Sequence, residues 1–305
     1  MNYIKLGNSE LNASVIALGC MRISEMSVKE VSELVNKCVE LGINFFDHAD
    51  IYGGGICEEL FGKVLKEKPG LRDDMLIQSK CGIRSGYFDF SKEHIISSTE
   101  NILKRLDIDR LDVLLLHRPD TLMEPEEVAE AFDLLHNKGM VRYFGVSNMN
   151  PAQIIFLEKA LNQKIIVNQL QFSAAHTGMI DNGICVNMKA DQGIDRDGCI
   201  LEFCRSANIT IQTWSSLQYG FFEGTFLNSK LYPKLNEVLD RIAKENNITS
   251  AAAAIAWILR HPAKMQVIPG TTKASRMADM AKAVNVELTR PEWYEIYLSA
   301  GNILP

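Results

Sequence analysis

Four side chains that can hold or transfer protons stand at the ends of successive apolar segments. Asp47 lies in "FFDHADIYG", which also contains Tyr52, while Lys80 ends "LIQSK" and His117 ends "LLLH". An ammonium beside a phenol favours the phenolate and lowers the pKa of the phenol, and a carboxylate keeps that ammonium charged and fixed. Asp47, Lys80 and Tyr52 therefore predict a proton donor whose pKa is brought nearer to neutral pH.

A neutral His117 would complete this site, because its imidazole could hydrogen-bond a substrate oxygen and orient it. The set suits protonation of an oxygen while a carbonyl is reduced, and it requires a cofactor to supply hydride. Each residue also has a structural interpretation: Lys80 could extend to solvent from a strand end, and His117 could belong to the core. It is improbable that an acid, a lysine and a histidine all end neighbouring strands for purely structural reasons. The prediction of a functional site therefore depends on the three residues occurring together.

The segments that carry these residues belong to a regular alternation along the chain. Short runs of β-branched, aromatic and aliphatic residues are each followed by a stretch of helical period. We expect eight strands, at 15–19, 44–49, 75–80, 111–117, 141–147, 165–172, 209–215 and 266–269. We expect helices at about 28–41, 58–67, 92–106, 125–138, 151–161, 196–207, 234–260 (two helices) and 273–283.

Strands that are apolar on both sides fit a parallel sheet covered by helices. Eight strand–helix repeats predict an α/β fold, a closed (β/α)8 TIM barrel, in which residues past the carboxyl ends of the strands line the active site. No Pro- or Ser-rich linker divides the chain, so residues 1–305 are expected to form one domain. We also expect a β-hairpin turning at Gly7-Asn8, a long loop at 176–198 and a short helix after Pro291.

Composition and charge narrow the possible partners. The 305 residues carry a formal net charge of −6 and no cluster of Lys and Arg, which argues against a nucleic-acid-binding surface. No apolar run reaches the roughly 20 residues needed to cross a bilayer, and the amino terminus lacks the pattern of a signal peptide. The seven cysteines form no CxxC pair, so we expect free thiols in a cytoplasmic protein. Nothing in these features indicates an oligomeric state.

Longer motifs around the four residues extend over most of the chain. They are "FFDHADIYGGG", "QSKCG", "LLLHRPD", "RYFGVSN", "VNQLQFS", "TWSSLQYG" and "IPGTTKASRM", in this order. In these motifs the chain resembles the aldo-keto reductase family, in particular bacterial members of unassigned substrate. The resemblance implies a barrel that binds NADP(H) and reduces a small-molecule aldehyde or ketone to an alcohol. It also implies that Tyr52 is the acid/base, that Asp47 and Lys80 tune it, and that His117 orients the carbonyl.

The cofactor is expected at the rim of the barrel, because the sequence has no Rossmann fingerprint. The cluster Gly53-Gly54-Gly55 is followed by Glu58 where that fingerprint needs its third glycine. The resemblance instead implies contacts from residues that end strands 1, 5, 6 and 7, with Trp214 stacked on the nicotinamide. These residues are Gly19, Cys20, Met21, Ser147, Asn148, Gln169, Trp214, Ser215 and Leu217. Without the resemblance, Asn148 could cap the next helix and Trp214 could be a core residue.

The segment after the last strand, "PGTTKASRM", joins a loop to a helix start, which is a natural anion site. The resemblance implies that Gly270, Thr271, Thr272 and Arg276 hold the cofactor there, with Arg276 on the 2′-phosphate. Arg276 could otherwise be an ordinary surface charge. Three positions depart from the family pattern: Ser216 replaces a proline, Gly270 a lysine and Met280 an asparagine, so the strictness of the preference for NADP over NAD stays open.

The substrate pocket is expected to be apolar. Its walls would come from loops after strands 1, 3 and 7, namely Cys20, Met21, Arg22, Tyr87, Phe88, Tyr219, Phe221 and Phe222. Three other functions remain open. The chain could be a regulatory channel subunit that holds cofactor with little turnover. It could be a metal-dependent hydrolase using Asp47, His48, Asp50 and His117, although strand 1 lacks the usual H-x-H pair. It could be a lyase that forms a Schiff base on Lys80.

Overall fold

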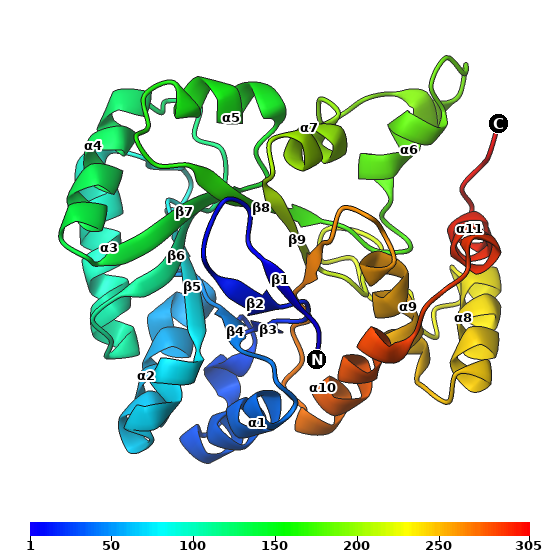
Figure 1. Ribbon diagram of the computed structural model, residues 1–305, viewed down its shortest axis with the longest axis horizontal. Helices are drawn as coiled ribbons and strands as arrows, with labels where there is room; N and C mark the ends of the chain where they lie inside the picture. Colours follow the sequence, from blue (N-terminus) through cyan, green and yellow to red (C-terminus); the bar gives the residue numbers. More distant parts are fainter.

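The computed structural model describes residues 1–305 and contains a sheet of eight parallel strands surrounded by helices (Figure 1). The strands follow one another around the sheet in chain order, as expected when each is joined to the next by a helix. They are β3 (Leu18–Gly19), β4 (Phe45–Asp47), β5 (Leu76–Cys81), β6 (Leu111–Leu116), β7 (Val141–Ser147), β8 (Ile165–Gln171), β9 (Thr210–Trp214) and β10 (Gln266–Val267). All eight predicted strands are therefore confirmed.

The sheet curls until its first and last strands lie together. The amide of Ala17 donates to the carbonyl of Val267 at 2.8 Å, and the amide of Val267 donates to the carbonyl of Val15 at 2.8 Å. Gly19 donates in the same way to Pro269 at 3.0 Å. These hydrogen bonds are consistent with the predicted (β/α)8 barrel.

Helices cover the outer face of the sheet, and their apolar sides form a buried cluster of 66 residues with it. They are α1 (Val28–Glu40), α2 (Ile56–Glu67), α3 (Lys92–Leu106), α4 (Pro125–Asn137), α5 (Pro151–Glu158), α6 (Gly178–Ile184), α7 (Ile200–Ser206), α8 (Pro233–Glu245), α9 (Ser250–Leu259), α10 (Ala274–Ala281) and α11 (Arg290–Ser299). The side chains of Ser27 and Ser91 cap α1 and α3 by accepting from backbone amides of the first turn.

The predicted N-terminal hairpin covers the amino-terminal end of the curled sheet. Its strands β1 (Tyr3–Lys5) and β2 (Asn12–Ser14) are antiparallel and lie over the middle of the molecule in Figure 1. The turn residue Gly7 has a φ of +49°, and its amide donates to Oγ1 of Thr210 at 2.8 Å. Leu6 is fully buried in a cluster of 10 apolar residues beneath the hairpin. Because the hairpin covers this end, the interior of the curled sheet is left open toward the carboxyl ends of the strands.

The prediction of a loop without regular structure at 176–198 is wrong. Helix α6 and a 3₁₀ turn at Asp191–Gly193 lie within this segment. The hydroxyl of Tyr297, in α11, donates to Asp181 of α6 at 2.9 Å. A helix of 7 residues is too short to be stable alone or to show a clear periodicity, so its tertiary contacts, which include this hydrogen bond, stabilise it.

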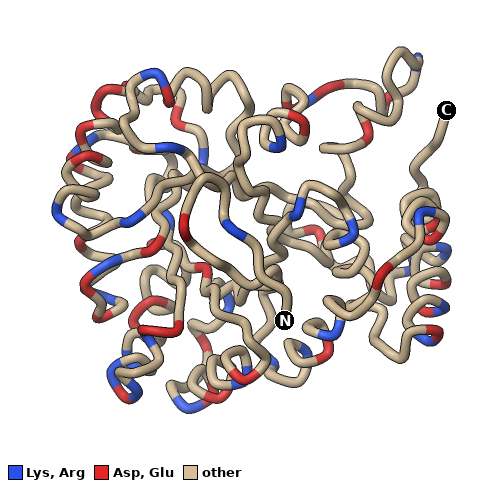
Figure 2. Tube along the Cα trace, viewed as in Figure 1, with Lys and Arg blue, Asp and Glu red and all other residues tan.

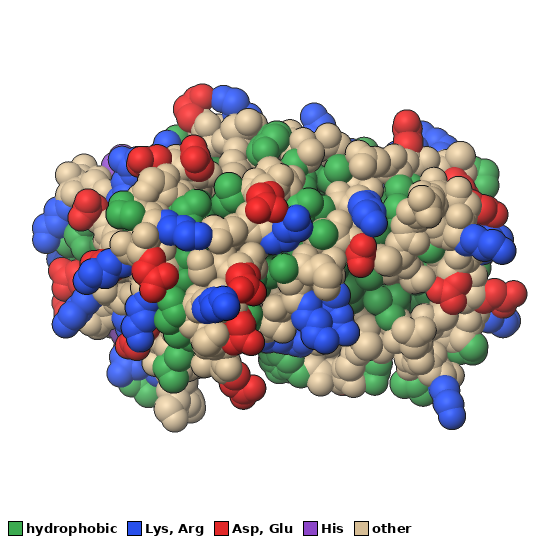
Figure 3. All heavy atoms as spheres, turned by 90° about the horizontal axis from the view of Figure 1, so that it is seen from below, with side chains coloured by type: hydrophobic (Ala, Val, Ile, Leu, Met, Phe, Trp, Pro, Cys, Tyr) green, Lys and Arg blue, Asp and Glu red, His purple; other side chains and the backbone are tan.

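Charged residues lie mostly on the outer helices and loops (Figure 2). On the face seen in Figure 3, acidic and basic side chains are interspersed, so this face has no extended patch of one sign. None of the helices combines the length and the apolar character that a membrane-spanning segment requires.

Candidate active site

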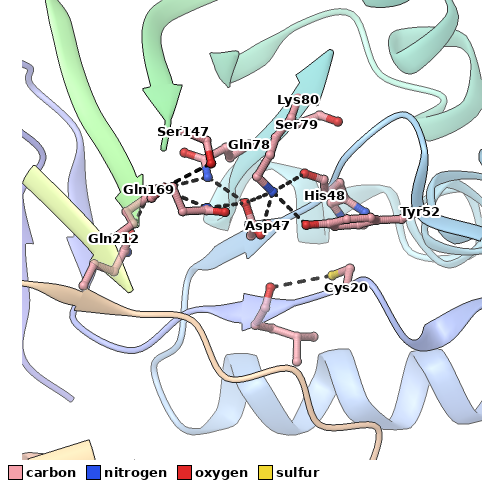
Figure 4. A network of polar contacts seen from close by, with 12 residues as sticks. Cys20, Asp47, His48, Tyr52, Gln78, Ser79, Lys80, Ser147, Gln169 and Gln212 are labelled. Atoms are coloured by element: carbon pink, nitrogen blue, oxygen red, sulfur yellow. Dashed lines mark hydrogen bonds and ion pairs between the residues drawn. The ribbon is translucent and has the colours of Figure 1, made fainter. Parts of the chain in front are cut away.

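Lys80 is fully buried at the carboxyl end of β5 and lies at the centre of a polar network (Figure 4). Its ammonium donates to both carboxylate oxygens of Asp47, at 2.7 and 2.8 Å, and to the carbonyl of His48 at 2.8 Å. The hydroxyl of Tyr52 lies 3.1 Å from the same nitrogen. The predicted set of Asp47, Lys80 and Tyr52 is therefore assembled in one place.

The parallel register of β4 and β5 explains how these residues meet. Asp47 ends β4 opposite Gln78 of β5, and the amide of Asp50 then donates to the carbonyl of Lys80 at 3.0 Å. The chain next turns through Gly53, which has a φ of +58°. A Cβ atom at this position would lie 2.6 Å from the side chain of Ser24, so only glycine fits the turn that holds the neighbouring tyrosine.

Burial and charge together set the protonation states. Burial alone would lower the pKa of Lys80, but Asp47 and Tyr52 outweigh it, and the pKa is raised above its ordinary value. Burial raises the pKa of Tyr52, and the nearby ammonium only partly offsets this effect. The prediction that the pKa of Tyr52 is lowered is therefore wrong, because the sequence spacing reveals the cation but not the burial. At neutral pH the site holds an ammonium and a protonated phenol.

His117 follows β6 and stands beside Tyr52, with ring centroids 6.0 Å apart and ring planes at 82°. Burial, reinforced by the charges of Lys80 and Arg118, places the pKa of His117 well below its ordinary value. The imidazole is therefore neutral, as the predicted role in orienting a substrate oxygen requires. Its Nδ1 is buried without a partner in the protein.

These side chains open into a cleft of about 820 Å³ at the carboxyl ends of the strands. The residues predicted to bind a cofactor line this cleft with one exception; those that do are Gly19, Met21, Ser147, Asn148, Gln169, Trp214, Ser215, Leu217, Gly270, Thr271, Thr272 and Arg276. The exception is Cys20, which is fully buried and directs its thiol to the carbonyl of Leu18 at 3.7 Å. The cleft thus extends from Tyr52 to the start of α10.

Asn148 and Trp214 are joined at the rim of the cleft. The indole Nε1 of Trp214 donates to Oδ1 of Asn148 at 3.1 Å, and the side-chain Nδ2 of Asn148 donates to Oγ of Ser147 at 2.7 Å. The residue that caps α5 is Asn150, which forms a capping box with Gln153. The helix-cap interpretation of Asn148 is therefore wrong. Trp214 is partly exposed to the cleft, so the core interpretation does not describe it either.

The predicted substrate pocket is only partly present. Met21, Arg22, Phe221 and Phe222 line the cleft, whereas Cys20, Tyr87, Phe88 and Tyr219 do not. Tyr219 donates its hydroxyl to the carbonyl of Glu223 at 2.7 Å. Tyr87 is 55% exposed and lies against the guanidinium of Arg84. Arg118 also lines the cleft and was not among the predicted residues, although it follows His117 directly.

Buried glutamines, not anticipated from the sequence, surround the carboxylate of Asp47 (Figure 4). The side-chain amides of Gln78 and Gln169 donate to the same oxygen of Asp47, at 2.6 and 3.0 Å. The same two amides also donate to Oε1 of Gln212, at 2.9 and 3.2 Å. The carboxylate is therefore held from the interior of the sheet as well as by Lys80.

The chain of amides continues to β10 and to the N-terminal hairpin, and its two ends fix the orientation of each amide. Gln212 donates to Gln266 at 2.8 Å, and Gln266 donates to the carbonyl of Ser14 at 2.8 Å. Because a carbonyl at one end and the carboxylate of Asp47 at the other can only accept, each amide between them has one satisfactory orientation. The amide nitrogen of Gln169 is thereby committed to the interior, and its carbonyl oxygen is left for the cleft.

We expect Gln78→Leu to lower the free energy of unfolding by about 1–3 kcal/mol, because Asp47 and Gln212 each lose a donor to a buried oxygen. Urea denaturation measures this change. Gln171→Leu is the matched control, since the buried amide nitrogen of Gln171 has no partner to lose. Its removal should leave stability unchanged or slightly higher. Equal losses in the two variants would show that the hydrogen bonds of Gln78 contribute nothing.

The geometry does not favour the hydrolase or the lyase. His48 is fully buried with its ring against Phe61, at a centroid distance of 4.6 Å, and Asp50 instead accepts from Ser98 at 3.4 Å. No group of three or more His, Cys, Asp or Glu residues is arranged to hold a metal ion. Lys80 is a buried, paired ammonium with a raised pKa, which makes it a poor nucleophile.

Over most of its length this chain is similar to known oxidoreductases. A sequence model of the Aldo/keto reductase family matches residues 15–297. The uncharacterized oxidoreductase YcsN of Bacillus subtilis is 36% identical over 302 residues, which cover 94% of this chain and 94% of that protein. A 6-dehydroglucose reductase of Agrobacterium fabrum is 34% identical over 306 residues, covering 96% of each. The crystal structure of a thermostable aldo-keto reductase in complex with the inhibitor epalrestat superposes with a TM-score of 0.78 at 27% identity, covering 98% of this chain and 100% of that one.

Proposed function

Because this chain belongs to the aldo/keto reductase family of oxidoreductases, we propose that it reduces an aldehyde or ketone to an alcohol with NADPH. When bound, NADPH supplies the hydride; the proton comes from Tyr52. The observation that carries this proposal is the 3.1 Å contact between the ammonium of Lys80 and the hydroxyl of Tyr52 beside an open cleft. That contact allows a neutral phenol to give up its proton without leaving an isolated buried charge.

The charges around Tyr52 determine the direction of proton transfer. The phenol is protonated at neutral pH, since burial raises its pKa. As the proton moves to the substrate oxygen, the phenolate forms beside the ammonium of Lys80, which Asp47 holds in place. A fixed charge of this kind stabilises the transition state more strongly in a buried site than in water. Neutral His117 hydrogen-bonds the same substrate oxygen and orients the carbonyl.

The cleft has suitable groups for both ends of NADPH. No side chain caps the amino terminus of α10, and Thr271 and Arg276 line the cleft at this point, so free amides and a positive charge are available for the 2′-phosphate. At the other end, the carbonyl oxygen of Gln169 suits the carboxamide of the nicotinamide. The partly exposed indole of Trp214 suits stacking on its ring.

In this proposal the loop after β9 would pass along the pyrophosphate. Ser215 donates its hydroxyl to Gln218 at 2.7 Å, and Ser216 donates to the carbonyl of Thr213 at 3.1 Å. Ser216 is buried. These hydrogen bonds hold the loop in place of the proline that the family pattern has at this position, so its geometry does not depend on that proline.

We also infer that the curled sheet is a closed barrel and that residues 1–305 form a single domain. The hydrogen bonds from Gly19 to Pro269 and from Ala17 to Val267 support closure. The shared cluster of 66 buried residues supports one domain, since it includes residues from the first strand of the sheet to α11.

The activity is tested by following NADPH absorbance with a panel of aliphatic, aromatic and sugar-derived aldehydes and ketones. We expect NADPH to be consumed with at least the more reactive aldehydes and the matching alcohol to form. NADPH binding without turnover across the whole panel would contradict the proposal. That result would instead support a protein that holds the cofactor for a regulatory purpose.

Arg276→Met should weaken NADPH binding by about 10- to 100-fold and leave NADH binding within twofold, because only NADPH carries the phosphate that the guanidinium would contact. Fluorescence quenching titrations with the two cofactors measure this difference. Arg290→Met, at an exposed arginine that does not line the cleft, is the matched control and should change neither affinity. An equal loss for NADPH and NADH in Arg276→Met would show that the 2′-phosphate lies elsewhere.

A further inference from the structure

Arg118 is a half-buried cation that lines the cleft beside the proton-transfer residues. It follows His117 directly, just after the end of β6. Its guanidinium carbon lies 5.5 Å from the ring centroid of Trp214 and 5.4 Å from that of Phe221. Two aromatic rings therefore hold the guanidinium at the end of the cleft where the carbonyl must react.

No acidic side chain compensates the charge of Arg118. Burial lowers the pKa of its guanidinium, and the only opposing effect comes from the phenol of Tyr52 rather than from a carboxylate. The partly buried Arg72 and Arg105, by contrast, pair with buried carboxylates at 3.0 and 2.7 Å. A guanidinium that has lost part of its hydration and has no counter-charge is a ready partner for an anion.

The other charged groups of the cleft leave this end positive, although the whole chain carries a net charge of −6. Arg22 lines the cleft as a second arginine. Of the acidic lining residues, Asp47 is paired with Lys80 at 2.7 Å, and Asp279 belongs to α10 at the opposite end, where it pairs with a lysine. Field lines in a cleft of this kind favour the entry of anionic substrates.

We propose that Arg118 binds an anionic oxyacid group of the substrate, so that the preferred substrates are carbonyl compounds that carry a carboxylate or a phosphate. This inference rests on the proposed reductase function. The planar guanidinium offers parallel N–H donors that match two oxygens of such a group. Because Arg118 is adjacent to His117, the anionic group would lie a few atoms from the carbonyl that His117 orients.

The experiment compares para-carboxybenzaldehyde with its methyl ester at saturating NADPH. In the wild type we expect kcat/KM to be at least about tenfold higher for the acid than for the ester. Arg118→Leu should lower kcat/KM for the acid by about 10- to 100-fold, mainly through KM, because a charged hydrogen-bonding partner is lost. The ratio of kcat/KM for the acid to that for the ester should fall by about the same factor, because the ester makes no charged contact with Arg118, and circular dichroism shows that the variant is folded.

A control variant and a second anionic substrate complete the experiment. Arg205→Leu, at an exposed arginine outside the cleft, should leave both compounds unaffected. The relative kcat/KM of para-formylphenyl phosphate and the carboxylic acid identifies which oxyacid the site prefers.

Equal kcat/KM for acid and ester in the wild type would overturn the inference. So would an Arg118→Leu variant whose KM for NADPH rises equally with either compound, because Arg118 would then serve the cofactor. No turnover of any aldehyde would overturn the proposed function and this inference with it.

Discussion

Tyr52→Phe should lower kcat for carbonyl reduction by about 10²- to 10⁴-fold, the usual contribution of a positioned general acid. The substitution removes only the hydroxyl that lies 3.1 Å from Lys80. Lys80 keeps its ion pair with Asp47 and its hydrogen bond to the carbonyl of His48, so the network and the fold should survive. Steady-state assays that follow NADPH absorbance with a reactive aldehyde measure kcat. NADPH fluorescence quenching should show unchanged cofactor affinity.

Tyr297→Phe is the matched control for Tyr52→Phe. Tyr297 has a buried ring whose hydroxyl donates to the carboxylate of Asp181, and it lies outside the cleft. Its loss should affect stability slightly and leave kcat unchanged. A Tyr52→Phe variant that keeps half of the wild-type turnover would show that the proton comes from another group.

The pH profile gives an independent check of the same assignment. Burial raises the pKa of Tyr52, and the protonated phenol is the form that donates. Reduction should therefore stay constant across neutral pH and decline only when alkaline pH removes the proton. The pKa of His117 lies well below its ordinary value, so its protonation should not reduce activity until the solution is clearly acidic. A profile that falls between pH 6 and 8 would indicate that a different group titrates.

The arrangement of strands and the identity of the proton-transfer residues could be predicted because both depend on local patterns. Apolar strands such as β6 are buried along their whole length, and the polar residue that follows β6, His117, lines the cleft. Parallel strands place all these ends at one edge, so Asp47, Lys80 and His117 must lie near one another whatever the details of packing. To complete the site, a turn must bring Tyr52 back toward Lys80, and the glycines that allow this turn, directly after Tyr52, are visible in the sequence.

What could not be predicted depends on burial and on contacts between distant segments. The pKa of Tyr52 moves opposite to the expectation because desolvation, which has no sequence signal, exceeds the effect of Lys80. Helix α6 is joined to α11 by a hydrogen bond between residues 116 positions apart, Asp181 and Tyr297, and such a distant contact has no signal in the local sequence. The glutamine chain had a usable signal, because Gln78 and Gln212 interrupt apolar strands at inward positions, and a buried polar side chain in such a strand requires a partner.

Lys80→Met should lower the free energy of unfolding by about 3–5 kcal/mol, the usual cost of removing one partner from a buried ion pair. Asp47 is only 3% exposed, so its carboxylate would lose both bonds to Lys80 without gaining access to water. Gln78 and Gln169 would still donate to it, but neither carries a charge. Lys37→Met is the matched control, because Lys37 forms an exposed pair at 2.9 Å and its loss should change stability little. Urea denaturation compares the two.

The double variant Asp47→Asn with Lys80→Met separates the electrostatic role of this pair from its catalytic role. With both charges gone, no unpaired ion remains in the interior, and we expect the double variant to regain most of the stability that Lys80→Met loses. Activity should not return, because the phenolate of Tyr52 would have to form with no cation beside it to stabilise it. If the double variant were no more stable than Lys80→Met, the loss would reflect the packing of the lysine chain. The buried charge of Asp47 would then not be what Lys80 compensates.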